Sequence, residues 1–391
     1  MNLSSANFAA PIEANALIDA VSWRISRSQI AAFLATVQLI LFSAHWSIYR
    51  TWTFFEGPPA RPAPVQGALS FFSLSFVAAT LLSHRYNNVV VRLYYKIAAI
   101  WLGFLNSFVV GGCFSWIAYL LFSAIAFPVN RAALGAIGLG LALILAIYGF
   151  LTAHRLRVQR ITLKIPNLPR AWRGRLAAQV SDTHLGHVHG QSFLKHIVRL
   201  LQRVGPDIVF ITGDLFDGSK VDPNELIEPW RDLKPPLGTY FVTGNHEEFG
   251  DPKEYLDAVR QVGVRILDNQ QETVDGMQII GLRYRDSVSR GRLQAILERK
   301  VRRESAAILL THAPYGVSLA AQAGVSLQLS GHTHGGQIFP FTYFTRKVFQ
   351  EYTHGLARFQ ELMIYTSSGA GTWGPPMRLG APPEIVLFEF A

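Results

Sequence analysis

Apolar residues follow two different patterns in the two parts of this chain. In the first 153 residues, four stretches are apolar on every side: 30–49, 65–83, 97–127 and 132–153. A helix needs about 20 apolar residues to cross the hydrocarbon core of a bilayer, because each residue rises only about 1.5 Å. The pattern therefore predicts four transmembrane helices. The third stretch is long enough either to tilt strongly or to break at Gly111 and Gly112.

Beyond residue 154 the pattern changes to that of a soluble domain. Ile161, Leu163 and Ile165 alternate with polar residues, as in a half-buried strand. Short apolar strands then alternate with segments of helical spacing, and this alternation predicts an α/β domain. Strands are expected at 176–180, 207–212, 239–243, 279–282, 306–310 and 327–329, and helices at 193–204, 223–233 and 252–262.

These patterns divide the chain into a lead-in (1–28), a transmembrane region (29–154) and a soluble domain (155–391). Composition supports the division, because only 16% of all residues are charged and an ordinary soluble protein has about 25%. The first 153 residues hold 8 basic and 3 acidic side chains, and the rest hold 28 and 23. The first 27 residues lack the pattern of a cleavable signal, so we expect them to stay attached. Cys113 is the only cysteine, which excludes an intrachain disulfide and a cysteine metal site.

Basic residues flank the predicted helices unevenly, with twelve on one side and three on the other. Because Lys and Arg are retained in the cytoplasm, both termini and the soluble domain are expected on the cytoplasmic side of the inner (plasma) membrane. Within the spans, His45 and Asn106 are the notable polar residues, and a lone histidine near a helix end favours an interfacial position. With no acidic residue in any span, the helices are interpreted as an anchor. Seven basic residues follow the fourth helix and either contact anionic headgroups or act as a plain stop-transfer flank: Arg155, Arg157, Arg160, Lys164, Arg170, Arg173 and Arg175.

Polar side chains of metal-ligand type follow five of the predicted strands. The carboxyl ends of neighbouring strands in an α/β sheet converge, so these side chains are expected to form one site. Carboxylates, amide oxygens and imidazoles are ligands of hard or borderline divalent metals. Seven ligands exceed the needs of one tetrahedral ion and suit two ions bridged by a carboxylate, a centre for phosphate-ester hydrolysis. The candidates are Asp182, His184, Asp214, Asn245, His312, His332 and His334.

The order of these blocks resembles that of the calcineurin-like metallophosphoesterases. The chain carries D-x-H, G-D-x-x-D, G-N-H-E, a lone strand-end His and G-H-T-H in that order, from Asp182 to His334. The tail, at 367–371, 375–380 and 383–385, is similar to that of the bacterial membrane-attached subgroup with N-terminal transmembrane helices. The resemblance implies a four-layer α/β/β/α sandwich of two mixed sheets.

The resemblance also implies a role for each residue. Asp182, His184 and His334 would hold one metal, Asn245, His312 and His332 the other, and Asp214 would bridge them. His246 would be catalytic, facing the phosphoryl group, where it can stabilise charge and protonate the leaving oxygen. Glu247 stands where the family more often has Asp, and Asp217 is read as a loop cap or as a partner behind the ligands. The ligands leave the identity of the metals open among Mn, Fe, Zn and Mg.

The implied activity is that of a membrane-bound phosphohydrolase acting on a phosphoester or pyrophosphate bond. The resemblance includes enzymes that cleave the pyrophosphate of a nucleotide-linked acylated sugar, such as a UDP-diacylglucosamine. A soluble nucleotide substrate and a transporter or sensor with a regulatory phosphoesterase domain are the alternatives. No nucleic-acid partner is expected, because the basic run lies beside the membrane rather than beside the site. The oligomeric state stays open.

Several other residues allow two interpretations. His187 and His189 either line a substrate pocket or are exposed on a loop. Arg283, Arg285 and Arg378 either bind substrate phosphate or are solvated. Trp172 either marks the membrane interface or covers the sheet.

Overall fold

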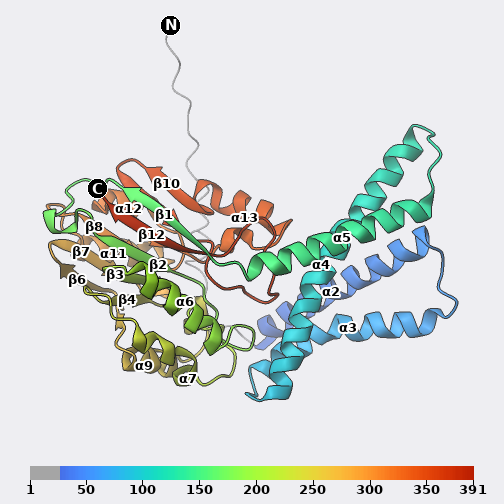
Figure 1. Ribbon diagram of the computed structural model, residues 1–391, viewed down its shortest axis with the longest axis horizontal. Coiled ribbons are helices and arrows are strands. Elements are labelled where there is room, and N and C mark those ends of the chain that lie inside the picture. Colours follow the sequence, from blue (N-terminus) through green and yellow to red (C-terminus); the bar gives the residue numbers. More distant parts are fainter. Residues whose placement is uncertain (1–26) are drawn as a thin grey trace, which may run out of the picture.

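Four long helices precede two packed sheets in the computed structural model, which describes residues 27–391 (Figure 1). The lead-in expected at residues 1–28 therefore lies almost entirely outside the described residues. The helices are α2 (Arg27–Phe55), α3 (Pro62–Ser83), α4 (Val89–Ala124) and α5 (Arg131–Ala153). All four are long and apolar enough to cross a membrane, in agreement with the four predicted spans. The alternative of a break in the third is wrong, because α4 runs unbroken through Gly111 and Gly112.

The glycines of α4 and α5 serve packing between the helices. A Cβ atom on Gly111 would collide with the carbonyl oxygen of Gly138, and one on Gly138 would lie 2.7 Å from the carbonyl oxygen of Gly111. Small residues let membrane helices approach closely, since dispersion contacts rather than the hydrophobic effect hold them together in lipid. Gly111 and Gly138 therefore set the distance between α4 and α5.

Polar side chains tie α2 to α4. The Trp101 indole N–H donates to Nε2 of His45 at 2.9 Å, and His45 Nδ1 lies 2.7 Å from the carbonyl oxygen of Leu41. The Trp116 indole donates to the Thr51 hydroxyl at 3.0 Å. His45 is almost fully buried between helices, and these contacts provide a partner for both of its ring nitrogens.

Two six-stranded sheets form the soluble part. In one the order is β1 (Arg157–Leu163), β12 (Glu384–Phe390), β2 (Leu176–Val180), β3 (Ile208–Thr212), β4 (Thr239–Val242) and β5 (Arg265–Ile266). In the other it is β10 (Gly355–Phe359), β11 (Leu362–Thr366), β9 (Leu327–Ser330), β8 (Ala307–Leu310), β7 (Met277–Gly281) and β6 (Gln270–Val274). Both sheets are mixed, because β12 runs antiparallel to β2, β10 to β11 and β6 to β7.

An apolar core joins the sheets face to face, and helices cover their outer faces. Phe210 and Tyr240 of the first sheet share one core with Ile308 and Leu329 of the second. The outer face of the first sheet packs against α6 (Gln191–Val204), α7 (Pro223–Ile227) and α9 (Lys253–Gln261). The outer face of the second packs against α11 (Arg290–Lys300) and α12 (Val317–Ala323). The result is the four-layer α/β/β/α sandwich of two mixed sheets that the resemblance implied.

Several elements of the structure were not predicted. They are strands β5, β6, β10, β11 and β12 and helices α11, α12 and α13 (Phe341–Phe349). Helix 223–233 is divided into α7 and the 3₁₀ turn η2 (Glu228–Asp232), because Pro229 lacks an N–H for the helical ladder. The remaining short elements are α8 (Asn245–Glu248), α10 (Tyr284–Ser287), η1 (Arg170–Trp172), η3 (His334–Gly336) and η4 (Gln350–Tyr352).

Trp172 covers the sheet and does not mark a membrane interface. Its side chain is fully buried, its indole N–H donates to the carbonyl oxygen of Val274 at 2.8 Å, and its ring meets Phe390 edge to face. The basic run is also more dispersed than expected. Strand β1 lies between the first and last residues of the basic run, and its seven residues extend over about 23 Å at 3.3 Å per residue. At the far end of the run, Arg175 pairs with Asp207 and Asp275. Only the first part of the run adjoins α5.

The soluble part is docked directly on the long helices. The Lys220 N–H donates to the carbonyl oxygen of Ser83 at the end of α3, and the Arg378 N–H donates to that of Gly149 in α5, both at 2.9 Å. Met377 and Ile338 form an apolar cluster with Ala146 of α5. Main-chain bonds and apolar packing therefore fix the position of the sheets relative to the helices.

Replacing Gly138 with Ala should force α4 and α5 apart, because the added methyl meets the Gly111 carbonyl and the Ser115 hydroxyl. Overpacking of this kind costs about 1–3 kcal/mol, so Gly138→Ala should lower the Tm of the full chain in detergent. Gly140→Ala in the same helix is the matched control, since nothing lies within 4 Å of the added methyl. Equal Tm values for the two variants would show that Gly138 does not set the contact.

Candidate metal centre

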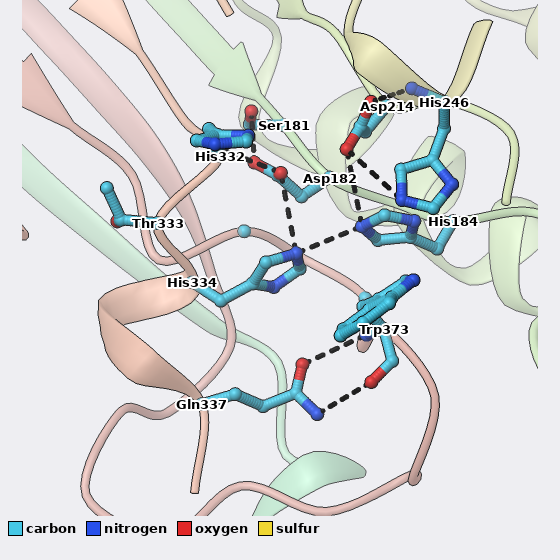
Figure 2. A network of polar contacts seen from close by, with 12 residues as sticks. Ser181, Asp182, His184, Asp214, His246, His332, Thr333, His334, Gln337 and Trp373 are labelled. Carbon is cyan, nitrogen blue, oxygen red and sulfur yellow. Dashed lines mark hydrogen bonds and ion pairs between the residues drawn. The ribbon is translucent and has the colours of Figure 1, made fainter. Parts of the chain in front are cut away.

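The predicted site residues lie together at one edge of the sandwich. Each follows the carboxyl end of a strand: β2, β3 and β4 in the first sheet, and β8 and β9 in the second. Figure 2 shows several of these side chains pointing into one space between the sheets. All seven predicted ligands and His246 line this space: Asp182, His184, Asp214, Asn245, His246, His312, His332 and His334.

One cluster joins the first and last blocks of the sequence. Nε2 of His184 lies 2.9 Å from Nε2 of His334, which lies 3.5 Å from Oδ1 of Asp182. Asp182 is fully buried, and its other oxygen accepts a 2.5 Å hydrogen bond from the hydroxyl of Ser181. The three residues can each direct one ligand atom at the same point.

A second cluster surrounds His312. Its Nε2 lies 3.1 Å from Oδ2 of Asp214, 3.1 Å from Nδ1 of His332 and 3.1 Å from Oδ1 of Asn245. Its Nδ1 lies 2.8 Å from the carbonyl oxygen of Thr212, which can only accept, so Nδ1 carries a proton. In the neutral ring, Nε2 is therefore the lone-pair nitrogen that a metal ligand requires.

Asp214 belongs to both clusters. Its Oδ2 lies 3.1 Å from Nε2 of His312 and 3.8 Å from Nε2 of His184. The same oxygen lies 4.0 Å from Nε2 of His246, and the other oxygen accepts a hydrogen bond from the His246 N–H. One carboxylate thus stands between the two groups of imidazoles.

The backbone of the site is held in an uncommon conformation. Five of the site residues have left-handed φ values between 47° and 72°: Asp182, His184, Asp214, His332 and His334. For residues with a Cβ atom this conformation costs about 1–3 kcal/mol and persists only where surrounding structure requires it. The bonds that hold it run between loops: the Asp182 and His184 N–H groups donate to the carbonyl oxygens of Gly213 and Asp214.

Two glycines allow the loops to approach one another. A Cβ atom on Gly244 would collide with the Asp214 carboxylate, and one on Gly331 would collide with the Ser181 hydroxyl. The glycines in front of Asn245 and His332 are therefore needed for close approach.

Charge and burial compete strongly in this space. Burial raises the pKa of Asp182. Burial alone would also raise the pKa of Asp214, but His312, His246 and His184 hold it well below its usual range. Burial opposes protonation of His312, yet Asp214 and Asp182 raise its pKa to about 10. Burial and the proximity of His312 lower the pKa of His332 to about 3. The two carboxylates thus favour a positive charge in their midst.

The residues fit a divalent cation. Carboxylate oxygens, an amide oxygen and imidazole nitrogens are the donors such ions take, and no thiol is present. Imidazole nitrogens 2.9 to 3.1 Å from one another bring several lone pairs to one place, and a cation between them would satisfy these lone pairs at once. Among the described residues, the buried Nδ1 of His184 also has no hydrogen-bond partner. The donor set is therefore a candidate site for divalent metal.

His246 is oriented from behind by a main-chain oxygen. Its Nδ1 lies 2.8 Å from the carbonyl oxygen of Asp217, so this nitrogen carries a proton and Nε2 faces the centre. Asp217 is half-buried, and its carboxylate accepts from the N–H and hydroxyl of Ser219. Asp217 thus caps its own loop and holds His246 through its backbone.

Glu247 braces the loops and does not touch the His246 ring. Its carboxylate accepts from the N–H groups of Asp214, Phe216 and Gly244 at 3.0, 3.0 and 2.7 Å. Burial and the nearby Asp214 raise its pKa. The longer glutamate side chain spans from the loop after β4 to the loop after β3 and so fixes the position of Asp214.

Arg378 was among the residues with two open interpretations, and neither describes it. It is fully buried, and its guanidinium donates to the carbonyl oxygens of His334, Gly369, Gly371 and Ala381. Burial lowers its pKa to about 10. Arg378 therefore braces the loop that carries His334, and nothing in its local sequence signals this role.

The histidines after β2 are not exposed loop residues. His187 is buried with Nε2 3.3 Å from the carbonyl oxygen of Ser83, and His189 lies 2.8 Å from the Thr372 hydroxyl. His187 thus contributes to the junction with α3. Of the other two arginines, Arg283 pairs with Asp268 and Arg285 with Glu248, so both have carboxylate partners within the chain.

Two aromatic side chains that the sequence did not mark form an exposed rim. The ring of Trp373 lies 6.3 Å from that of His246 and the side chain is 60% exposed, while Phe249 lies 5.1 Å from His246 and is 70% exposed. Figure 2 shows how Gln337 holds the main chain of Trp373, donating to its carbonyl oxygen at 3.0 Å and accepting from its N–H at 2.9 Å.

Comparison with known proteins matches the domain that carries this centre. A family model described as calcineurin-like phosphoesterase matches residues 177–336. An uncharacterised metallophosphoesterase from Aquifex aeolicus is 32% identical over 63% of this chain and 96% of its own length. One from Campylobacter jejuni is 37% identical over 59% of this chain and 62% of its own. A transmembrane protein with metallophosphoesterase domain from Danio rerio is 32% identical over 62% of this chain and 59% of its own. The chain thus spans less than two thirds of the last two relatives.

Replacing Glu247 with Gln should destabilise the loops around Asp214, because an amide presents N–H groups where three backbone N–H groups need an acceptor. A buried donor left without a partner costs about 1–3 kcal/mol. The Tm of the metal-free protein should therefore fall, as measured by thermal denaturation in detergent with a chelator.

Glu228→Gln is the matched control for this measurement. Glu228 is exposed and forms an exposed ion pair with Arg231, so the Tm of Glu228→Gln should change little. If Glu247→Gln and Glu228→Gln were equally stable, the carboxylate of Glu247 would not be the brace described above.

Proposed function

We propose, on the premise that the chain belongs to the calcineurin-like metallophosphoesterase family, that it is a membrane-bound phosphohydrolase with a two-metal centre. Membership makes it a metal-dependent phosphoesterase, and the number of metals and the substrate are our inferences. The observation that carries the two-metal proposal is the position of Asp214, whose Oδ2 lies between His184 and His312. We take residues 29–154 as the membrane region and 155–391 as the catalytic domain.

The assignment of ligands follows the two clusters. We assign Asp182, His184 and His334 to one ion and Asn245, His312 and His332 to the other, with Asp214 shared. When bound, two divalent ions supply Lewis acidity that activates a water molecule and neutralises charge on the phosphoryl group. The chain contributes fixed donor positions, since Glu247 and the left-handed loops hold the carboxylates and imidazoles before substrate arrives.

His246 is assigned to proton transfer at the leaving oxygen. Its Nδ1–H is held by the carbonyl oxygen of Asp217, which leaves Nε2 as the nitrogen that faces the centre. When protonated, Nε2 can donate to a phosphoryl oxygen and then release its proton to the departing alkoxide or phosphate. His246 also lies close enough to His184 and Asp214 to bind metal, so its role has to be tested by metal content as well as by rate.

A lipid-linked phosphate or pyrophosphate is the substrate class we favour. The centre is docked on helices apolar enough to span a membrane, and Trp373 and Phe249 place exposed apolar surface beside His246. Such a rim suits a substrate with an apolar part, and a UDP-diacylglucosamine is the leading specific candidate. We place the catalytic domain at the cytoplasmic face of the plasma membrane, on the basis of the flanking Lys and Arg residues.

A soluble nucleotide is the second candidate. The same exposed Trp373 and Phe249 rings could stack on a nucleobase. A phosphodiesterase of this kind would need no contact with the bilayer. The two candidates thus differ in whether an acyl chain is required for turnover.

Replacing Asp214 with Asn should abolish hydrolysis of a chromogenic phosphodiester and lower the bound metal, because the shared carboxylate is lost. His246→Gln should keep the metal and lower kcat about 10²–10⁴-fold, the range for a lost general acid. Metal content by elemental analysis and steady-state rates after chelation and reloading with Mn, Fe, Zn or Mg check both. Full activity in Asp214→Asn would overturn the metal assignment, and loss of metal in His246→Gln would make His246 a ligand.

The substrate class can be tested with purified full-length protein in detergent. We expect kcat/KM for lipid-linked pyrophosphates to exceed that for the same headgroup without acyl chains, with cyclic nucleotides and monoesters as further substrates. Asp214→Asn serves as the inactive control for contaminating phosphatases. Equal kcat/KM with and without acyl chains would favour the soluble nucleotide and contradict the lipid-linked class.

A further inference from the structure

Helix α13 presents apolar side chains that no part of the described chain covers. None of its residues is fully buried. Thr342, Thr345 and Phe349, spaced i, i+3 and i+7, are half-buried against the domain. Phe341, Phe344 and Val348 repeat the same spacing on a second face and are 57%, 56% and 65% exposed. We refer to these three residues as the apolar stripe.

A third face of α13 is basic. Arg346 and Lys347 are exposed in the last turn, and the Lys347 ammonium lies 5.4 Å from the centre of the Tyr343 ring. An apolar stripe beside a basic face is the composition of a helix that lies in the headgroup layer of a membrane. Lys and Arg can then extend toward anionic headgroups while the stripe enters the acyl boundary.

The position of α13 next to the long helices selects the bilayer as its partner. Two residues before α13, the carbonyl oxygen of Phe339 accepts a 2.9 Å hydrogen bond from the Asn106 side chain, near the middle of α4. Ile338 packs against Ala146 of α5. Figure 1 shows α13 beside the end of α5 that enters the domain. The segment that leads into α13 therefore contacts both α4 and α5, so the stripe begins close to the helices that are apolar enough to span a membrane.

The inner face of α13 reaches the metal centre. The ring of Phe349 lies 6.3 Å from that of His332 and 5.8 Å from that of Tyr315. At its other end α13 packs on the turn after His334 so closely that a Cβ atom on Gly336 would lie 2.6 Å from the Thr342 nitrogen. Helix α13 therefore contacts His332 through Phe349 and the turn after His334 through Thr342.

We propose that α13 inserts its apolar stripe into the headgroup layer of the bilayer and so holds the mouth of the metal centre at the lipid surface. The inference rests on the membrane attachment proposed above, but it requires neither a lipid substrate nor phosphatase activity. It identifies a second membrane contact, made by the catalytic domain itself.

Spin labels on single cysteines measure this contact in the full chain. With Cys113→Ala as background, Phe344→Cys and Val348→Cys label the stripe, Ile144→Cys labels the exposed face of α5, and Leu356→Cys labels an exposed position on β10. The protein is placed in nanodiscs of phosphatidylcholine and phosphatidylglycerol. Collision rates with oxygen, which enters lipid, and with a water-soluble nickel chelate then report the depth of each label.

We expect labels at 344 and 348 to lie about 5–10 Å below the headgroup surface, the depth of an interfacial helix. The label at 144 should lie deeper, and the label at 356 should collide mainly with the nickel chelate. Labels at 344 and 348 that behave like the label at 356 would overturn the insertion of α13 while leaving the membrane attachment intact. Protection of the stripe from both reagents would also overturn it, since a protein would then cover α13. A water-exposed label at 144 would instead refute membrane attachment.

Discussion

The architecture depends on two buried carboxylates, Asp182 and Asp214, held where the carboxyl ends of two sheets meet. Removing a charge from water costs several kcal/mol unless an opposite charge and hydrogen bonds replace the lost hydration. Here the replacement comes from imidazoles and backbone N–H groups of the surrounding loops. The left-handed residues, the glycine turns and the Glu247 brace are all consequences of bringing these donors to one place.

Arg378 connects this centre to the long helices. Its main-chain N–H bonds the Gly149 carbonyl in α5, while its buried guanidinium donates to the carbonyl oxygens of His334 and of the loop at 369–371. One residue therefore links a candidate metal ligand to a helix apolar enough to span a membrane. Together with the contacts of His187 and Lys220 to Ser83, this linkage makes the domain and the bundle a single packed unit.

Much of the site could be predicted because its signals are local. Asp182, Asp214 and Asn245 each follow a short apolar strand, and the strand-end rule places such residues at one edge without knowledge of the sheet order. Strand β12 was missed although its apolar run is itself typical of a buried strand, and only the structure shows that it lies between β1 and β2. Helix α13 was missed because a nine-residue run rich in aromatic and β-branched residues fits a strand as well as a helix by periodicity alone.

The sequence by itself determined the four apolar helices, the α/β class and the set of donor side chains, because composition, periodicity and motif order are properties of short segments. Only the tertiary structure decided that Asp214 stands between two groups of imidazoles, that Trp172, His187 and Arg378 are buried, and that the stripe on α13 is left exposed. Burial and contact depend on which distant segments pack together. The same arginine or tryptophan is solvated or enclosed according to neighbours that its own sequence context does not specify.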